Sequence, residues 1–365
     1  MVETIHIVEP TLESQSGHCH SFVSSLFKAD PARTFRLWVD RHAKLRVPGN
    51  VTVVPYFFRT FRRIQAFFLY RRLLREPGIL FISTAGRIDF MLLDWASRGI
   101  NQDRKAFLFV HWFRPTTSKK RILTKIASRH SELTILVPTD TLLNLFNSYG
   151  FKNTILTPYP ITPPNSEDSQ NTKTFSHLLF AGAARTDKGF GYIVDLVERM
   201  SLEQRTVPLV IQTSPGHYGK YDEQIREDFK RLQQADYPAL RTCPDVLDSR
   251  SYDELFHGAI CLQLYSQQDF ADRISGVTLD ALSAGCPVIT LSGTWIARVV
   301  SEFNAGIVLD SPAPEQVISA ITALLGQFET YQNNAVKAGR ELQLRHNAGH
   351  LLDELTVKNR FAGSQ

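Results

Sequence analysis

The sequence of 365 residues lacks the features that mark several classes of protein. It contains four cysteines and no Cys-x-x-Cys pair, which argues against a disulfide framework or a zinc site and suits reduced thiols in a cytoplasm. No stretch approaches the ~20 apolar residues that a membrane-spanning helix needs. The N-terminus reaches the strand-like Ile5–Val8 without a charged region followed by an apolar one, so we expect no signal peptide.

The sequence also lacks a large excess of charge of either sign. The chain has 41 Lys and Arg against 36 Asp and Glu, a net charge of +5. This balance permits a nucleic acid, a phosphate group or an anionic membrane as partner but selects none of them. Hydrophobic residues make up 43% and charged residues 21%, which is typical of a globular protein and excludes disorder as the main state.

Short apolar runs separated by longer amphipathic stretches fill both halves of the chain. The runs are continuous rather than alternating, which is typical of strands buried on both faces of a parallel sheet. We predict strands at residues 5–8, 35–39, 51–54, 79–83, 106–111, 133–137, 153–156, 177–180, 209–213, 240–243, 259–264, 287–291 and 306–309. Strand–helix alternation predicts right-handed βαβ units and an α/β fold.

Residues 161–176 are rich in proline and small polar residues and form the best candidate linker. We therefore expect two doubly wound, Rossmann-like domains, residues 1–160 and 177–340, followed by a C-terminal helix and tail at 341–365. In open α/β sheets, ligands bind outside the carboxyl ends of the strands. We expect the two domains to face each other across such a cleft.

The first candidate loop is residues 181–190, AGAARTDKGF, between the predicted strand 177–180 and a helix. Small residues let the backbone approach an anion, and Arg185 and Lys188 add a bidentate donor and a point charge. A diphosphate clamp is one interpretation. The alternative is a solvated turn with surface charges.

The second candidate loop contains Asp272 and leads through Ser275 and Gly276 into a predicted helix. Backbone N–H groups at a helix start can hold phosphate oxygens. Asp280 lies about one turn into this helix, where a carboxylate can accept hydrogen bonds from the two hydroxyls of a ribose. The alternative for each acid is a helix cap or an exposed charge.

Taken in order, the loop at 181–190, the segment LDALSAGCPVIT at 279–290, GTWIARVV and AGIVLD resemble the C-terminal half of a GT-B glycosyltransferase. The pattern is similar to the retaining family 4, and the match covers roughly residues 177–325. Two departures stand out. Asp272 and Asp280 occupy the positions of two glutamates, and the glycine follows Ser275 instead of the first acid.

The resemblance implies a nucleotide-sugar donor held mostly by the C-terminal domain and transfer with retention of configuration. Arg185 and Lys188 would grip the diphosphate, Asp280 the ribose, and Asp272 would lie near the donor sugar. Further donor contacts are expected from Gly17, Gly182, Ser275, Gly276 and Val277.

We expect no metal or other cofactor. The chain contains no Asp-x-Asp pair that would hold Mg²⁺ or Mn²⁺. Arginine, lysine and helix dipoles would then stabilise the leaving diphosphate, and stabilisation of developing charge is commonly the largest catalytic contribution. His18-Cys19-His20 has no second pair of ligands to complete a metal site.

The N-terminal half offers two loops for the donor phosphate or the acceptor. Gly17 precedes a predicted helix in the way of the glycine loop of this fold, and His111 ends a buried strand where it can contact a sugar hydroxyl or the acceptor. A structural histidine is the alternative for His111. Thr84–Arg87 is a weaker candidate for acceptor contact.

Residues 56–75 contain six arginines, no acid and several aromatic rings. If helical, the segment suits anionic lipid headgroups or a lipid-linked acceptor. A core helix with solvated arginines, a nucleic-acid patch and a partner surface are the alternatives. The residues expected to make the contact are Arg59, Arg62, Arg63, Phe67 and Arg71.

The sequence thus predicts a cytoplasmic glycosyltransferase, peripheral at the inner face of the membrane, that moves a sugar from a nucleotide diphosphate to a glycan or lipid-linked acceptor. A nucleotide-sugar 2-epimerase of the same fold, or a non-catalytic scaffold that keeps it, are the alternatives. Nucleic-acid binding is not expected, because no recognition motif accompanies the basic segment.

Overall fold

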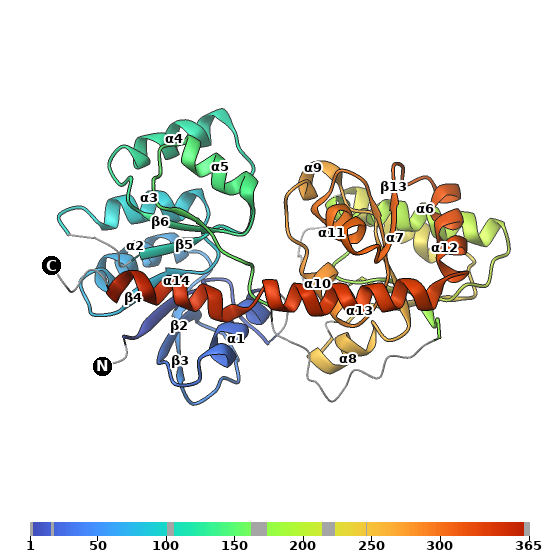
Figure 1. Cartoon of the computed structure of the whole chain (residues 1–365), viewed down its shortest axis with the longest axis horizontal. Coiled ribbons are helices and arrows are strands. Elements are labelled where there is room, and N and C mark those ends of the chain that lie inside the picture. Colours follow the sequence, from blue (N-terminus) through green and yellow to red (C-terminus); the bar gives the residue numbers. More distant parts are fainter. Residues whose placement is uncertain are drawn as a thin grey trace. The chain divides into compact units, whose positions relative to one another are not determined.

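The computed structural model describes residues 3–15, 18–100, 106–161, 174–213, 223–245 and 247–360. Its contacts divide the chain into two compact units, a first unit of Met1–Thr162 with Arg345–Gln365 and a second unit of Pro163–Leu344. Each unit contains one parallel sheet with helices around it (Figure 1). Most of the predicted linker falls on residues 162–173, outside the described part of the chain.

The first unit is built on a seven-stranded sheet of order β3-β2-β1-β4-β5-β6-β7, and all its strand pairs are parallel. Every apolar run of the first half forms a strand, as predicted. The strands are β1 (Ile5–Val8), β2 (Phe35–Asp40), β3 (Val51–Phe57), β4 (Ile79–Ile82), β5 (Ala106–Phe109), β6 (Thr134–Val137) and β7 (Thr154–Leu156). The chain order reverses between β1 and β4, which makes their carboxyl ends the switch point of this sheet.

Helices cover both faces of this sheet. They are α1 (His18–Ala29), α2 (Arg62–Leu73), α3 (Arg87–Ala96), α4 (Thr117–Ala127), α5 (Asp140–Ser148) and α14 (Ala348–Arg360). Apolar residues of α2 to α5 share one core with Leu80, Ile82 and Leu108. Phe22 of α1 packs instead on the rings of Phe81 and Phe109, whose side chains alternate to the other face. The C-terminal α14 packs against α1.

One predicted helix begins later than expected. The sequence predicts a helix from residue 57 to 74, but β3 runs to Phe57 and α2 begins only at Arg62. Phe57 pairs with Asp40 of β2. The side chain of Gln65 then holds the turn, because it accepts from the N–H of Phe58 and donates to the carbonyl of Tyr56.

The second unit has a six-stranded parallel sheet of order β10-β9-β8-β11-β12-β13, with its switch point between β8 and β11. All the runs predicted in this half form strands. They are β8 (His177–Phe180), β9 (Leu209–Gln212), β10 (Leu240–Cys243), β11 (Ala259–Gln263), β12 (Val288–Leu291) and β13 (Gly306–Leu309).

The helices of the second unit are α6 (Phe190–Leu202), α7 (Glu223–Gln234), α8 (Ser249–Glu254), α9 (Gln267–Phe270), α10 (Gly276–Ser283), α11 (Trp295–Phe303), α12 (Pro314–Leu325) and α13 (Phe328–Arg345), with a 3₁₀ turn at Thr186–Lys188. The core of one face is formed by α6, α7 and α12 on β8, β9, β11 and β12. In the part of the chain that the structure describes, no helix is both long and apolar enough to cross a bilayer.

Candidate active site

The loop after β8 is shaped by two glycines with positive φ. Gly182 has φ +94°, and its N–H donates to the side chain of Gln212 at 2.6 Å. A Cβ at Gly182 would lie 2.6 Å from Nζ of Lys188, so the ammonium group rests directly over this glycine. Gly189, with φ +73°, ends the 3₁₀ turn, and a Cβ there would overlap the carbonyl oxygen of Leu264. The turn therefore directs Lys188 back across the loop.

Helix α10 begins beside this loop, at the switch point of the second sheet. Ser275 is its N-cap and accepts from the N–H of Thr278 at 3.3 Å. The N–H groups of Gly276 and Val277 belong to the first turn and have no acceptor within the helix. A Cγ of Val277 lies 3.5 Å from the Cβ position at Gly182. The fold thus brings together four predicted site residues, Gly182, Lys188, Gly276 and Val277.

Positive charge is concentrated at this point. Asp187 accepts from Arg185, with an Nε–Oδ1 distance of 2.7 Å, and from Arg273, with an Nη1–Oδ2 distance of 3.4 Å. Burial and the two arginines lower the pKa of Lys188 to about 8, although Asp187 opposes them. Asp269 also acts electrostatically on Arg273, so the three cations Lys188, Arg185 and Arg273 face two carboxylates, and this excess of positive charge favours an anionic ligand.

Asp280 lies one turn further along α10. Its Oδ2 accepts from the hydroxyl of Tyr252 in α8 at 3.1 Å. The Asp280 side chain is exposed at the surface, yet desolvation by the protein packed around the carboxyl raises its pKa to about 7, against the hydrogen bond from Tyr252 and the charge of Lys188. The carboxyl of Asp280 therefore titrates near neutral pH.

The structure gives Asp272 a different setting. Its Oδ1 accepts from Arg298 of α11 at 2.9 Å, and the same guanidinium donates to the carbonyl of Ala271 at 2.8 Å. Arg298 therefore neutralises Asp272. Arg273, the next residue along the chain, is the one that joins the charges around Asp187.

Polar residues also gather at the switch point of the first sheet. Glu9 follows β1 directly, is buried, and accepts from Thr11 and Ser83 at 2.8 Å and from Thr84 at 2.5 Å. The ring of His111, just beyond β5, has Nε2 at 2.6 Å from the carbonyl oxygen of Ser83. Because a carbonyl oxygen only accepts, Nε2 is the protonated nitrogen in this arrangement.

His111 is held by rings on its other sides. It packs against Phe22, Phe109 and Tyr159 at centroid distances of 5.0 to 5.2 Å. Thr84 Oγ1 lies 3.5 Å from His111 Nε2 and so connects the histidine to Glu9. The structure therefore places His111 at the end of a hydroxyl network that starts from a buried carboxylate.

Sequence reasoning missed one residue at the switch point of the first sheet and two in the second unit. Glu9 was detectable, because it is the first residue beyond a buried strand. Gln212 was detectable too, because it is a polar residue at the end of the buried strand β9. Tyr252 has no local signal, since only the packing of α8 against α10 brings it to Asp280.

Other predicted residues lie elsewhere. Gly17 falls outside the described residues. Phe67 is half-buried against the core of the first unit, and it is Phe68 that is exposed. Arg71 donates to the carbonyls of Ala96 and Arg98, so it ties α2 to the end of α3. Arg59, Arg62 and Arg63 are exposed.

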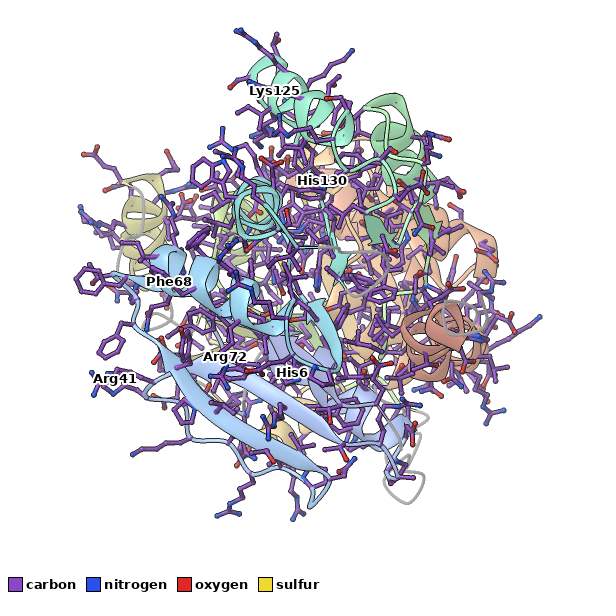
Figure 2. All side chains as sticks on the ribbon, turned by 90° about the vertical axis from the view of Figure 1, so that its left-hand side faces the viewer. His6, Arg41, Phe68, Arg72, Lys125 and His130 are labelled. Carbon is purple, nitrogen blue, oxygen red and sulfur yellow. The ribbon has the colours of Figure 1, made fainter. Side chains whose placement is uncertain are left out.

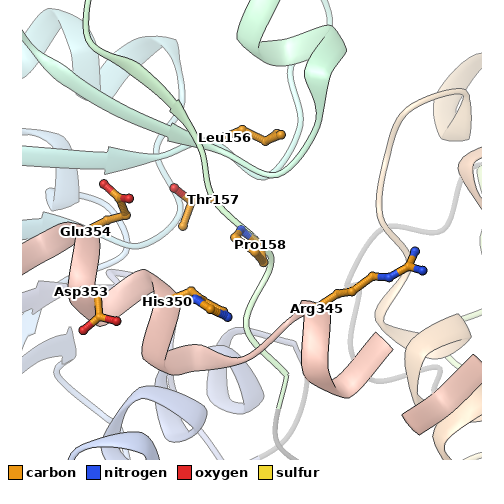
Figure 3. A pocket seen from close by; sticks show the side chains of 7 residues that line it. All are labelled: Leu156, Thr157, Pro158, Arg345, His350, Asp353 and Glu354. Carbon is orange, nitrogen blue, oxygen red and sulfur yellow. The ribbon is translucent and has the colours of Figure 1, made fainter. Parts of the chain in front are cut away.

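A separate surface pocket of about 390 Å³ lies in the first unit beside α14 (Figure 3). It is lined by Leu156, Thr157, Pro158, Arg345, His350, Asp353 and Glu354. Its two carboxylates offset its basic side chains, whereas Lys188, Arg185 and Arg273 outnumber Asp187 and Asp269. The second unit is the better place for a diphosphate.

Among the described residues, no group of three or more His, Cys, Asp or Glu side chains is arranged to hold a metal ion.

No protein-family model matches the sequence, and no curated protein matches it. Solved structures match it over nearly all of its length. Sucrose-phosphate synthase of Thermosynechococcus elongatus has a TM-score of 0.71 and 13% identity, covering 99% of this chain and 100% of that one. The glycosyltransferase WaaG, which is involved in lipopolysaccharide biosynthesis, has a TM-score of 0.68 and 13% identity, covering 96% and 99%.

HepE of Anabaena, in complex with UDP-glucose, has a TM-score of 0.69 and 11% identity, and the match covers both chains completely. The chain has the fold of the GT-B glycosyltransferases. The predicted fold class of two doubly wound α/β domains is confirmed. Identities of 11 to 13% carry no residue roles from these enzymes. The assignment of the GT-B site residues in this chain therefore depends on its own geometry.

Proposed function

We propose that this protein is a glycosyltransferase that moves a sugar from a nucleotide diphosphate to a glycan or lipid-linked acceptor, with retention of configuration. One observation carries the proposal. Lys188 lies over Gly182 and faces the open first turn of α10, with Asp280 one turn beyond. This spacing fits a diphosphate followed by a ribose. The binding of UDP-glucose by HepE, which has the same fold, supports a nucleotide sugar as donor.

In this proposal the second unit binds the donor. Lys188 supplies a point charge to the diphosphate, and the N–H groups of Gly276 and Val277 hold its oxygens at the start of α10. A Cβ at Gly276 would meet nothing within 4 Å, which leaves room for the ligand there. Arg185 shares its charge with Asp187 in this structure, and a diphosphate would compete with that carboxylate for the guanidinium.

The same cations serve the reaction. As the bond between sugar and phosphate breaks, negative charge grows on the leaving diphosphate, and fixed positive groups stabilise it. Lys188, Arg185 and the N-terminus of α10 supply this stabilisation, so we propose transfer without a metal. Asp280 accepts the ribose hydroxyls in its ionised form.

For the acceptor side we propose His111, whose ring is fixed by Ser83 and by the surrounding aromatic rings. Asp272 is proposed to lie near the donor sugar, which requires its ion pair with Arg298 to open or to turn with the ligand. We name no nucleophile and infer no covalent intermediate. Cys19, Cys261 and Cys286 have raised pKa values, chiefly through burial, and are poor thiolate nucleophiles.

Ligand-dependent thermal stability tests the donor site. UDP, GDP, ADP, TDP and CMP and their common sugar conjugates are screened against the whole chain. One base is expected to raise the stability by about 2.7 kcal/mol at a hundredfold excess over its Kd. Lys188→Ala and Asp280→Ala should lose this shift. Lys337→Ala, which removes an exposed lysine on α13, should keep it.

The opposite result is equally informative. If no nucleotide stabilises the protein, or if Lys188→Ala responds as the Lys337→Ala control does, the donor assignment is wrong. A non-catalytic binding protein of the same fold then becomes the better interpretation. We also propose a cytoplasmic location for the enzyme, since none of the four cysteines forms a disulfide.

A further inference from the structure

The positive charge of the chain is concentrated in one segment of the first unit. Residues 57–130, which include α2, α3 and α4, contain sixteen Lys and Arg but only four Asp and Glu. Their net charge is therefore +12, whereas the whole chain has +5, so the rest of the chain is net negative. Of the acids in this segment that the structure describes, Asp89 and Asp94 have little exposed surface, and Glu76 is paired with Arg72.

This charge lies on one helical layer. Helix α3 packs between α2 and α4, and the three helices cover the same face of the sheet. We call the outer surface of residues 58–72, α3 and α4 the basic aromatic face. Figure 2 shows Phe68 on α2 and Lys125 on α4 at the surface of this side of the unit.

The cations of the basic aromatic face are largely uncompensated. Arg62 and Arg63 on α2 are exposed, and no carboxylate lies within 4.0 Å of them among the described residues. Helix α4 likewise exposes Lys120, Arg121 and Lys125, and none of these has a carboxylate of the described residues within 4.0 Å. Such a surface repels itself unless an anionic partner covers it.

Large apolar side chains stand between these cations. Phe61, Ile64 and Phe68 are 58 to 61% exposed, and Phe58 and Trp95 are more than 40% exposed. These five are half of the ten large hydrophobic side chains that are exposed in the part of the chain described. Helix α2 packs on the core through Ala66, Leu69, Tyr70 and Leu73. The outward ring of Phe68 contacts Phe67 at its edge, and Arg41 lies over the ring of Phe58, but both rings stay largely open to solvent.

We infer that the basic aromatic face docks on an anionic lipid bilayer. Headgroup phosphates would pair with the arginines and lysines, and the exposed rings and Ile64 would enter the boundary with the acyl chains. A nucleic acid would satisfy the charges but would leave the aliphatic Ile64 in water. This inference goes beyond the proposed function and does not depend on it, because it uses no residue of the donor site.

Co-sedimentation of the whole protein with vesicles tests the inference. Phosphatidylcholine vesicles are compared with vesicles that also contain phosphatidylglycerol. The protein is expected to sediment only with the anionic vesicles, and less so at high salt, because salt screens exposed charges. Replacing Arg62→Gln and Arg63→Gln together should lower the partition coefficient by roughly thirtyfold. Phe61→Ser with Phe68→Ser should lower it by about tenfold.

The controls make matched changes in the second unit. Lys337→Gln with Arg340→Gln removes two exposed charges from α13, and Leu202→Ser removes a side chain that is 81% exposed. Both should bind anionic vesicles as the unchanged protein does. Equal sedimentation with both kinds of vesicle would overturn the inference, as would controls that lose as much binding as the test variants. Binding to single-stranded RNA but not to vesicles would assign the face to nucleic acid.

Discussion

Lys188 and Asp280 define a narrow pH window for the donor site. The pKa of Lys188 is lowered to about 8 and that of Asp280 is raised to about 7. In the donor site that we propose, binding needs the ammonium of Lys188 and the carboxylate of Asp280 at once. Affinity for a nucleotide sugar should therefore be highest between about pH 7 and 8 and fall on each side, by up to about tenfold per pH unit. Calorimetric titration across this range measures the profile.

Two substitutions separate the two limbs of that profile. Asp280→Asn should remove the decline below pH 7, because no carboxyl is left to protonate, although the overall affinity drops. Lys188→Arg should remove the decline above pH 8, since a guanidinium stays charged. A nucleotide sugar is the right probe, because its diphosphate gains no proton in this range. A profile that stays flat from pH 6 to 9 in the unchanged protein would contradict this account.

Glu9 shows how a single residue can join the ends of two neighbouring strands, β1 and β4. Its carboxylate accepts from Thr11, Ser83 and Thr84. Glu9→Ala leaves these hydroxyls without their acceptor and opens a space, so we expect a loss of about 2–4 kcal/mol in unfolding free energy. Glu9→Gln keeps an acceptor of the same shape and should lose less. Glu13→Ala, on an exposed side chain nearby, is the control.

Chemical denaturation of the three variants measures these differences. Equal losses for Glu9→Ala and Glu9→Gln would mean that the charge of Glu9, and not its hydrogen-bonding capacity, stabilises the strand ends. A loss in Glu13→Ala as large as in Glu9→Ala would contradict the network altogether.

At the scale of elements, the turn from β8 into α6 depends on one glycine. Gly189 has φ +73°, and any Cβ there would overlap the carbonyl oxygen of Leu264. Gly189→Ala should therefore lower the unfolding free energy by about 3 kcal/mol or more, through strain and steric overlap. Denaturant titration checks this value.

The start of α10 provides the matched comparison. Gly276 is also a glycine beside the site, but its Cβ position is open. Gly276→Ala should keep the stability of the protein and weaken nucleotide binding, because the new methyl group occupies the space proposed for the diphosphate. If both glycine variants lose the same stability, the two positions are not distinguished as the structure indicates.

At the scale of the whole molecule, the two units present their positive charge in different ways. The cations around Lys188 lie half-buried at a switch point, a setting that suits a small anion. Those of the basic aromatic face are exposed on helices and suit an extended anionic surface. The sequence showed both basic segments, but only burial and pairing separate a site from a surface. Arg71 belongs to the basic segment of the sequence, but it donates hydrogen bonds to the carbonyls of Ala96 and Arg98 and so has a structural role.

The sequence by itself determined the order of strands and helices, the loop that carries Lys188 and the helix that carries Asp280. These are local properties, set by runs of buried apolar residues and by glycine, serine and proline at the ends of elements. Only the tertiary structure decided that Val277 lies beside Gly182, that Tyr252 donates a hydrogen bond to Asp280 and that Arg298 forms an ion pair with Asp272. Val277 and Gly182 meet because parallel pairing sets β8 beside β11, and Arg298 reaches Asp272 because β12 lies on the other side of β11. No local pattern of the sequence encodes this order of strands.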